Sequence, residues 1–299
     1  METNASHHIS SGPFDAASPV VVPYEKRLSQ DWEWAMAEGS RFFDGTNKVH
    51  ATMQNLAKRL EEMRIPYAVV GGMALTRYEY KRFTDDLDVL VTQESLDRIH
   101  KELEGRGYVL PFKNSKHLRD TDTGVKVEFH VSGQYPGDGK PKPVAFPDPS
   151  GVAEQYHSIH FLSLAALIEL KLASGISNAD RGKDLVDVRE LIVKNGLDRD
   201  YADKLNPYVR EPFLRIWDRI SENITYLTVM TFPTLSQTPQ DWSQLFAALP
   251  EEKQVLLPMQ NAGLELEPSR SRKPNEVWFK SNNPALAKTF DMHSASDYR

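Results

Sequence analysis

The sequence predicts an α/β (α+β) fold, in which a small mixed sheet is flanked by helices and followed by a helical C-terminal region. The main observation is the stretch from Tyr67 to Val91 (YAVVGGMALTRYEYKRFTDDLDVLV), which has the order strand, glycine turn, helix, second strand. The segment from Val125 to Val131 (VKVEFHV) adds a further strand, because its apolar and polar residues alternate cleanly. From Leu162 onward the pattern changes to apolar and amphipathic helices.

Length and composition limit the function classes. The 299 residues suffice for one large domain or two modest ones, and no window approaches the roughly eighteen uninterrupted apolar residues of a membrane span. The net charge of −6 argues against a generally basic surface that coats DNA. The absence of cysteine excludes disulfides and thiolate zinc sites, and the amino end lacks the basic start and apolar core of a secretory signal. We therefore expect a soluble, cytoplasmic protein with no membrane partner.

The first half of the chain is expected to hold a tail and the α/β core. Residues 1–22 are rich in Ser, Ala, Pro and His, so we expect a disordered N-terminal tail. Residues 23–160 should form the α/β core, preceded by helices at Trp32–Phe43 and Asn47–Met63. A charged amphipathic helix is expected over Gln93–Arg106.

The second half is expected to be helical and then irregular. Gly133–Gly151 is dense in Gly and Pro, which predicts a long loop directly after the third strand. Residues 161–262 should form a helical region that includes a buried helix at Leu162–Ala173 and another at Arg181–Lys194. Residues 263–299 are polar and without periodicity, which predicts an irregular C-terminal tail.

Two carboxylates on one strand are the strongest chemical signal. Because side chains alternate along a strand, Asp86 and Asp88 point to one face, where they can bind divalent metal ions. Glu128 is the best third carboxylate, since a neighbouring strand with matching alternation would present it to the same face; on an edge strand it would face solvent instead. Asp122 is the alternative third acid, in a turn-like segment.

The Gly71-Gly72 pair supplies the other half of a phosphate site. Glycine lets backbone N–H groups approach phosphate oxygens closely, although an ordinary strand-to-helix turn would use the same residues. The Walker A pattern GxxxxGK[ST] is absent, and no GxGxxG follows a strand. The chain is therefore expected to be neither a P-loop protein nor a Rossmann dehydrogenase.

These motifs together resemble a known signature. Gly71-Gly72-Met73-Ala74 followed by Asp86-Leu87-Asp88-Val89 resembles the signature of the polymerase-β-like nucleotidyltransferase superfamily. The pattern R-x-T-x-D-x-D from Arg82 is similar to that of AbiEii-type toxins and related prokaryotic nucleotidyltransferases. Lys171 and the Lys183–Asp187 segment (KDLVD) are similar in order and type to that group's later lysine and K/R-D-x-x-D segment.

The resemblance, which covers roughly Met63 to Lys194, implies a nucleotidyltransferase-type sheet and a reaction. The enzyme would move a nucleoside monophosphate from a nucleoside triphosphate (NTP) to a hydroxyl acceptor by a two-metal mechanism. The catalytic and metal-binding residues would be Asp86, Asp88 and Glu128, with Mg²⁺ or Mn²⁺ as cofactor. The third acid of such enzymes is usually aspartate, so Glu128 is a departure that reaches one methylene further. The nucleotide-binding residues would be Gly71, Gly72, Arg82, Thr84 and Lys171.

Several assignments have plain structural alternatives. Lys171 could contact a phosphate or simply extend its charged end from a buried helix. Asp184 and Asp187 lie at i and i+3, and we favour a structural role in which they orient cations such as Arg82 over metal binding. His130 is expected to be a strand residue with a satisfied hydrogen bond rather than a catalytic base.

The acceptor and partners remain open at this stage. A toxin-like enzyme would act on tRNA or other RNA, or on a protein side chain, and would have an antitoxin partner. The alternatives are a small, aminoglycoside-like acceptor, or a non-catalytic relative that binds a nucleotide or a partner protein. Arg77, Lys81 and Arg82 precede the aspartates and would form a local basic patch if they share a face.

Overall fold

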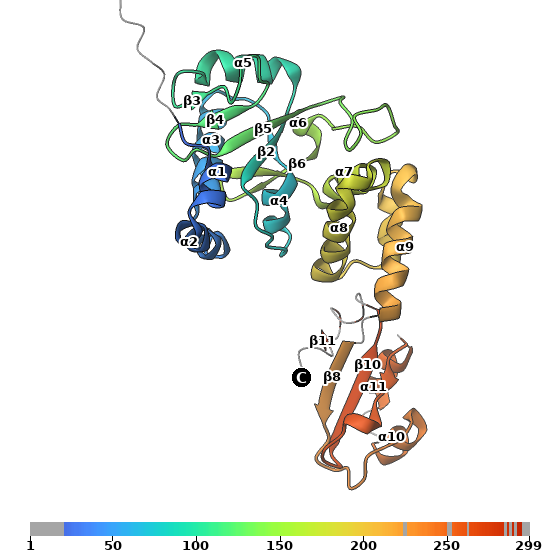
Figure 1. The fold of residues 1–299 in the computed structure, drawn as a ribbon. Helices are drawn as coiled ribbons and strands as arrows, with labels where there is room; N and C mark the ends of the chain where they lie inside the picture. Colours follow the sequence, from blue (N-terminus) through green and yellow to red (C-terminus); the bar gives the residue numbers. More distant parts are fainter. Residues whose placement is uncertain are drawn as a thin grey trace, which may run out of the picture.

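The structure is a computed structural model that describes residues 21–223, 226–249, 253–261, 263–283, 286, 289 and 292–294. Of the tail expected at residues 1–22, only the last two residues are described, so the prediction of disorder lies outside the described residues. Figure 1 shows the path of the chain from the N-terminal helices to the C-terminal strands.

The first sheet is mixed and contains seven strands in the order β3-β4-β5-β2-β1-β7-β6. Two of its pairings are parallel, β2 with β5 and β1 with β7, and the others are antiparallel. This arrangement confirms the predicted fold class. The strands are β1 (Ala68–Val69), β2 (Asp86–Val91), β3 (Tyr108–Val109), β4 (Leu118–Asp120), β5 (Lys126–Val131), β6 (Ala153–Tyr156) and β7 (Ile159–Leu162).

Helices contact the strands of this sheet. The helix α3 packs on β2 and β7, α4 on β2 and β7, and α5 on β5. Polar side chains begin two of them: Asn47 accepts from the N–H of His50 at the start of α3, and Thr92 caps α5. The helices of this part are α1 (Tyr24–Gln30), α2 (Trp32–Phe43), α3 (Lys48–Glu62), α4 (Gly71–Arg77), α5 (Gln93–Leu103) and α6 (Pro149–Val152).

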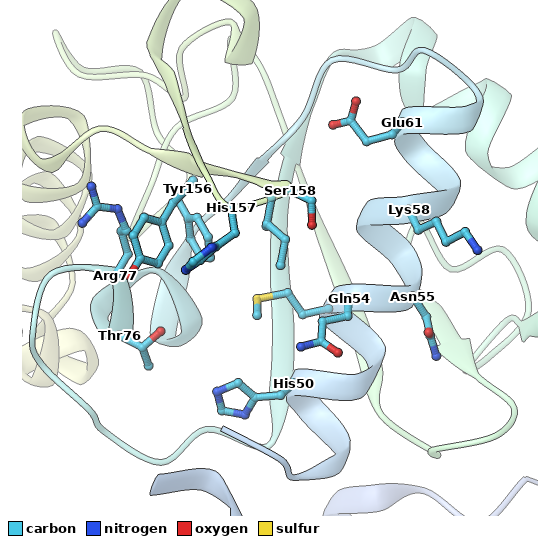
Figure 2. Close-up of a pocket in the computed structure, with 13 residues that line it drawn as sticks. His50, Gln54, Asn55, Lys58, Glu61, Thr76, Arg77, Tyr156, His157 and Ser158 are labelled. Carbon is cyan, nitrogen blue, oxygen red and sulfur yellow. The ribbon is translucent and has the colours of Figure 1, made fainter. Parts of the chain in front are cut away.

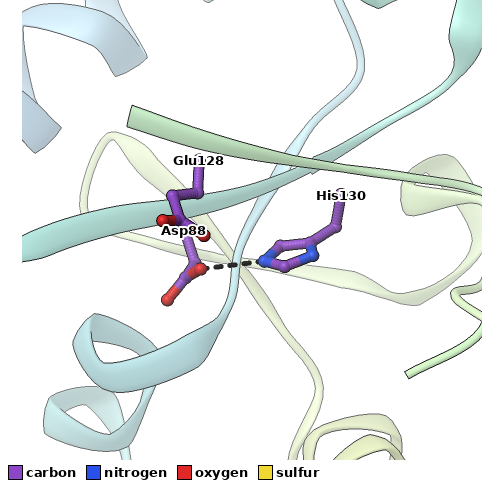
Figure 3. A group of neighbouring side chains, drawn as sticks. All are labelled: Asp88, Glu128 and His130. Carbon is purple, nitrogen blue, oxygen red and sulfur yellow. Dashed lines mark hydrogen bonds and ion pairs between the residues drawn. The ribbon is translucent and has the colours of Figure 1, made fainter. Parts of the chain in front are cut away.

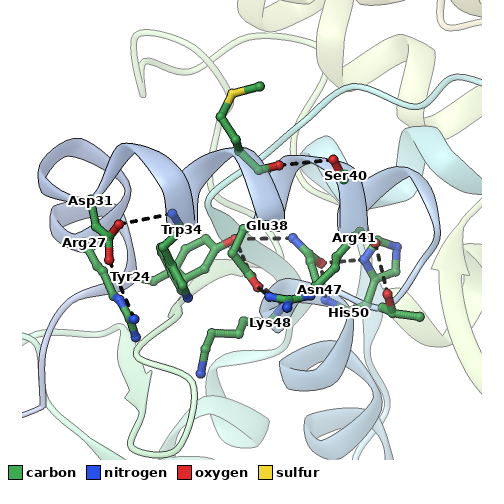
Figure 4. A network of polar contacts seen from close by, with 12 residues as sticks. Tyr24, Arg27, Asp31, Trp34, Glu38, Ser40, Arg41, Asn47, Lys48 and His50 are labelled. Atoms are coloured by element: carbon green, nitrogen blue, oxygen red, sulfur yellow. Dashed lines mark hydrogen bonds and ion pairs between the residues drawn. The ribbon is translucent and has the colours of Figure 1, made fainter.

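A buried carboxylate ties the N-terminal helices together (Figure 4). The side chain of Glu38 on α2 is only 2% exposed and accepts a hydrogen bond of 3.0 Å from the Tyr24 hydroxyl. It also accepts from the backbone N–H of Lys48 at 3.0 Å and from Arg41 at 3.0 Å. Burial, together with the negative charge of Glu38, raises the pKa of the Tyr24 phenol. The network therefore fixes α1 and α2 against the start of α3.

Three helices follow the sheet and pack on one another (Figure 1). They are α7 (Leu164–Ser177), α8 (Gly182–Asn195) and α9 (Pro207–Asn223), with short 3₁₀ turns at Ala179–Arg181 and Arg199–Lys204. Their apolar faces join one hydrophobic core with the first sheet, and that core extends to Ile220. Among the described helices, none has the length and apolar character needed to cross a membrane.

The C-terminal part differs from the expectation of a helical region over 161–262 and an irregular tail over 263–299. It contains β8 (Tyr226–Thr231), β9 (Glu265–Leu266), β10 (Glu276–Ser281) and β11 (His293–Ser294), which form a four-stranded antiparallel sheet. The helices α10 (Trp242–Ala248) and α11 (Lys253–Asn261) and a 3₁₀ turn at Pro268–Arg270 lie between these strands in sequence.

The C-terminal residues form strands because buried and partly exposed side chains alternate along them. Val277 and Phe279 of β10 are 2% and 0% exposed, whereas Trp278 and Lys280 between them are only partly buried. This part has a hydrophobic core cluster of its own, which shares no residue with the first.

Candidate active site

The parallel pairing of β2 and β5 builds the site. Asp88 lies directly opposite Glu128, and Asp86 lies opposite Lys126. The residues between these polar positions are buried in the core, so the carboxylates point to the other face of the sheet. Glu128 therefore lies on the strand beside β2 and faces the same side of the sheet as Asp86 and Asp88, as predicted.

One cavity of about 430 Å³ collects the predicted residues. It lies over the carboxylate face, and residues of α7 and the beginning of α8 also line it. Its lining includes the residues that the sequence assigned to metal and nucleotide binding: Gly71, Gly72, Arg82, Thr84, Asp86, Asp88, Glu128 and Lys171. Asp122, the alternative third acid, lines a different cavity.

The closest group of ligand-type atoms in the cavity differs from the predicted triad. Ligand atoms of Asp88, Glu128 and His130 all lie within 4.8 Å of one another, and Figure 3 shows these side chains converging from the two strands. Asp86 is not in this group. Its Oδ1 instead accepts a hydrogen bond of 2.7 Å from the Thr84 hydroxyl.

The two aspartates of β2 have opposite electrostatic environments. Burial, with the negative charges of Asp88 and Glu128, raises the pKa of Asp86 to about 6. Burial acts in the same direction on Asp88, but the hydrogen bond and charge of His130, with Lys171 and Arg181, lower its pKa overall. The Nε2 of His130 lies 2.8 Å from Asp88 Oδ1. The repulsion between carboxylates at Asp86, together with the oxygen-rich donor set, fits a divalent cation.

The two glycines are required by packing against the site residues. Gly71 has a φ of 61°, and a Cβ atom there would lie 1.9 Å from Oδ2 of Asp88. A Cβ atom on Gly72 would lie 2.9 Å from Cβ of Thr84. The glycine pair therefore allows the start of α4 to touch the carboxylate strand, where any side chain would displace Asp88.

The predicted cations are held by two buried carboxylates of α8. Lys171 Nζ lies 2.7 Å from Oδ2 of Asp187 and 3.1 Å from Oδ1 of Asp184. Arg82 donates to Oδ2 of Asp187 at 3.2 Å, and its Nε lies 2.9 Å from Oδ1. Ser174 donates to Asp184 at 2.7 Å. Asp184 and Asp187 thus orient cations, as expected, and join α7, α8 and the segment before β2.

The sequence comparison decides the family. A sequence model of a family described as uncharacterised nucleotidyltransferases matches residues 24–214, which is more than half of the chain. The chain belongs to this family. No curated protein matched it.

Several solved nucleotidyltransferase structures are distantly similar. An antigenic nucleotidyltransferase-like protein from Paracoccidioides brasiliensis has 16% identity, covers 48% of this chain and 74% of its own, and gives a TM-score of 0.33. ANT(2″)-Ia in complex with adenylyl-2″-tobramycin has 12% identity, and the match covers 56% of this chain and 95% of ANT(2″)-Ia, with a TM-score of 0.35. A putative nucleotidyltransferase from H. pylori has 18% identity, with 61% and 84% coverage and a TM-score of 0.33.

His130, Arg181 and Lys183 line the nucleotidyltransferase cavity, although the sequence did not assign them to the site. His130 belongs to the converging group, and its position two residues after Glu128 on an alternating strand was the signal that placed it on the same face. Arg181 and Lys183 line the cavity and are exposed, and in the part of the chain that the structure describes neither has an ion-pair partner. Arg181 precedes the K-D-x-x-D segment and Lys183 begins it. The acids of that segment pair with Lys171 and Arg82, not with these two cations.

Arg77, Lys81 and Arg82, which would form a basic patch if they shared a face, have different partners in the structure. Arg77 lies over the ring of Tyr156 at 4.3 Å, Lys81 donates to the carbonyl of Phe43, and Arg82 pairs with Asp187. The three side chains therefore serve three different contacts.

A second and larger cavity carries none of the predicted chemistry (Figure 2). Its volume is about 690 Å³, and it lies between α3, the end of α4 and the hairpin of β6 and β7. Glu61 is its one carboxylate among the described lining residues. The smaller cavity is therefore the candidate active site of this nucleotidyltransferase.

Proposed function

We propose that this nucleotidyltransferase moves a nucleoside monophosphate from an NTP to a hydroxyl acceptor. The observation that supports it most is the convergence, in one cavity, of two aspartates from β2, a glutamate from β5 and the glycine turn before α4. This set matches what the reaction needs: ligands for divalent cations beside a place where a phosphate chain can approach the backbone.

Asp86, Asp88 and Glu128 are the residues that would bind Mg²⁺ or Mn²⁺. Bound there, the cations would polarise the α-phosphate and neutralise the charge that develops on the leaving pyrophosphate. The chain keeps the ligands in place through neighbouring contacts: Thr84 donates to Asp86, and the Asp88 carboxylate lies against Gly71.

The transfer exchanges one phosphorus–oxygen bond for another. The acceptor oxygen forms a bond to the α-phosphorus and gives up its proton to water, while the bond to the oxygen bridging to the β-phosphate breaks and pyrophosphate leaves. Arg181 and Lys183 are the cations best placed to offset the triphosphate charge, because they line the cavity without a carboxylate partner of their own.

We assign Arg82 and Lys171 an indirect role at the same site. Each is already paired with a buried carboxylate of α8, so its charge is largely compensated before any nucleotide binds. Their contribution would be to position α7 and α8 over the cavity, and Lys171 also contributes to the lowered pKa of Asp88.

The remaining hypotheses differ in the acceptor: RNA or protein for a toxin-like enzyme, or a small aminoglycoside-like molecule. The AbiEii-like motif favours a toxin-like enzyme that acts on RNA or protein, with an antitoxin partner, over an aminoglycoside-like small acceptor. The described cavity contains both unpaired carboxylates and unpaired cations, so its charge alone favours neither a cationic drug nor a polyanion.

The test is a labelling experiment with a double variant. Wild-type protein and Asp86→Asn/Asp88→Asn are incubated with α-labelled NTPs, Mg²⁺ or Mn²⁺, and pools of RNA, protein and small hydroxyl acceptors. We expect label on one acceptor class with the wild type and at least a hundredfold less with the double variant. Asp97→Asn, an exposed change on α5, is the matched control and should label like the wild type.

Equal labelling by wild type and double variant would refute the assignment of the aspartates. Metal-dependent thermal stabilisation by NTP, with no label on any acceptor, would instead support the non-catalytic relative.

A further inference from the structure

His130 has the position of a metal ligand next to two carboxylates. It lies two residues after Glu128 on β5 and therefore on the same face of the sheet. Its Nε2 lies 2.8 Å from Oδ1 of Asp88, and all three side chains keep ligand atoms within 4.8 Å of one another. The side chains of Asp88, Glu128 and His130 are 17%, 25% and 25% exposed, so the group is accessible from the cavity and yet partly shielded from water.

The imidazole ring is held in a fixed plane. It stacks on Phe146, with ring centroids 4.8 Å apart and an interplanar angle of 22°. Phe146 is itself fixed by two backbone hydrogen bonds across the base of its loop: Gly133 donates to its carbonyl at 2.8 Å, and its N–H donates to Gln134 at 2.8 Å. A stacked ring and a closed loop limit the rotation of His130, so Nε2 keeps pointing at the carboxylates.

The geometry points to His130 as a direct metal ligand with Asp88 and Glu128, which makes the site selective for a transition-metal dication such as Mn²⁺ over Mg²⁺. This inference rests on the proposed function, because both require a divalent cation at the β2 carboxylates. It goes beyond that function by adding a nitrogen ligand that the three-carboxylate assignment lacks.

The spacing of the atoms suits this role. Metal–ligand bonds of about 2.1 Å at right angles separate neighbouring ligand atoms by about 3 Å. The observed 2.8 Å between Nε2 and Oδ1 is close to that separation, so a cation could replace the hydrogen bond without a large movement of either side chain. Lys126, which is now paired with Glu128, would release that carboxylate to the cation.

The chemistry of the donors gives the selectivity. Mg²⁺ is a hard cation that prefers oxygen ligands and keeps much of its water. Imidazole nitrogen is a ligand of divalent transition metals rather than of Mg²⁺, and Mn²⁺, which also takes carboxylate oxygen, is the weakest binder of that series. A site with one nitrogen and two carboxylates is therefore expected to bind transition-metal dications, Mn²⁺ among them, more tightly than Mg²⁺.

The experiment measures Mn²⁺ bound to the full chain by pulsed electron paramagnetic resonance, which detects a directly coordinated nitrogen without any need for activity. We expect a ¹⁴N modulation from imidazole in the wild type and its loss in His130→Asn. By calorimetric titration, the same variant should bind Mn²⁺ about tenfold more weakly, with less than a threefold change for Mg²⁺. His157→Asn, an exposed change at the β6–β7 turn, is the control and should retain both signals.

A second variant tests the selectivity from the opposite direction. His130→Asp restores an all-oxygen donor set and should lower the ratio of Mn²⁺ to Mg²⁺ affinity at least fivefold. Bound Mn²⁺ without a nitrogen signal in the wild type would overturn this inference and leave the proposed function intact. No binding of either metal to the wild type would count against the proposed function itself.

Discussion

Asp86 and Asp88 are two identical residues to which the fold gives different properties. The hydrogen bond and charge of His130 stabilise the ionised form of Asp88, whereas Asp86 has the neutral donor Thr84 and three negative neighbours, Asp88, Glu128 and Asp85. In the unfolded chain the two aspartates have similar environments. Bringing the carboxylates together on folding therefore lowers the stability of the folded state.

Because repulsion at the ionised Asp86 destabilises the folded state, we predict that Asp86→Asn stabilises the metal-free protein at neutral pH. The fold raises the pKa of Asp86 from 3.8 to about 6, so the folded state binds the proton more tightly than the unfolded chain. The stabilisation by that proton is complete below pH 3.8 and is lost as the pH rises through about 6. Above that pH the wild type carries a penalty of roughly 1–3 kcal/mol, which the amide variant avoids.

The measurement is urea unfolding without metal at pH 7.5 and pH 5.0. The gain from Asp86→Asn should be clear at pH 7.5 and should shrink at pH 5.0. Asp97, which is exposed on α5 and does not line the cavity, provides the control Asp97→Asn, with changes within about 0.5 kcal/mol at both pH values. A gain that is independent of pH would show that repulsion at Asp86 is not its source.

Gly71→Ala is predicted to disrupt the site as well as the turn. Its Cβ atom would lie 1.9 Å from Asp88 Oδ2, so the carboxylate must move. Gly45→Ala is a matched control, because Gly45 also has a positive φ, of 74°, but has no atom within 4 Å of the added Cβ. Backbone strain should lower the free energy of unfolding of both variants by about 1–2 kcal/mol. Only Gly71→Ala should also lose Mn²⁺ affinity, by tenfold or more in a titration. Equal metal affinity in the two variants would mean that the contact with Asp88 is unimportant.

At the scale of elements, the connection between α7 and α8 depends on buried charges. Removing the cation in Lys171→Met leaves Asp184 and Asp187 with fewer partners in a nearly dry environment, which should lower the free energy of unfolding by about 3–5 kcal/mol. Lys183→Met is the comparison, since that exposed side chain lines the same cavity without an ion-pair partner among the described residues.

The two lysine variants should therefore separate stability from nucleotide binding. Lys183→Met should change unfolding by less than about 0.5 kcal/mol but weaken NTP binding several-fold, as measured by urea unfolding and by a fluorescent NTP titration. If Lys183→Met destabilised the protein as much as Lys171→Met, the division between a structural and a phosphate-facing lysine would be wrong.

Periodicity made the central elements predictable. Trp32–Phe43 is a helix with the predicted ends, and the alternation of VKVEFHV placed Glu128 on the correct face. Local sequence did not report the pairing of distant strands, so neither the contact of His130 with Asp88 nor the parallel pairing of β1 with β7 could be derived from it. These contacts depend on strand order and register, which tertiary packing sets.

The C-terminal strands were missed for a different reason. The segments of β8 and β10 are as long as β2 and β5, but polar residues and turns surround them, and their alternation was weak against the helical pattern of the preceding residues. The second core, around Phe279, forms only when these strands and α10 come together. The boundaries at residues 160 and 262 stay predictions.

At the scale of the whole molecule, the two hydrophobic cores predict a separable C-terminal part. The first core ends at Ile220 and the second begins at Phe232. A chain that ends at Asn223 should therefore still unfold cooperatively, with a Tm within several degrees of the full chain, and should bind Mn²⁺ with unchanged affinity. Calorimetry and metal titration check this. Loss of a cooperative transition would show that the C-terminal strands are needed for the first core to fold.

The central claim is that the carboxylate face of β2 and β5 is a metal-dependent nucleotide site. The most direct test is the thermal shift produced by a non-hydrolysable NTP analogue, with and without Mn²⁺, in the wild type and in Asp86→Asn/Asp88→Asn. We expect a rise of several degrees only for the wild type and only when the metal is present. An equal rise in the double variant, or a full rise without metal, would contradict it.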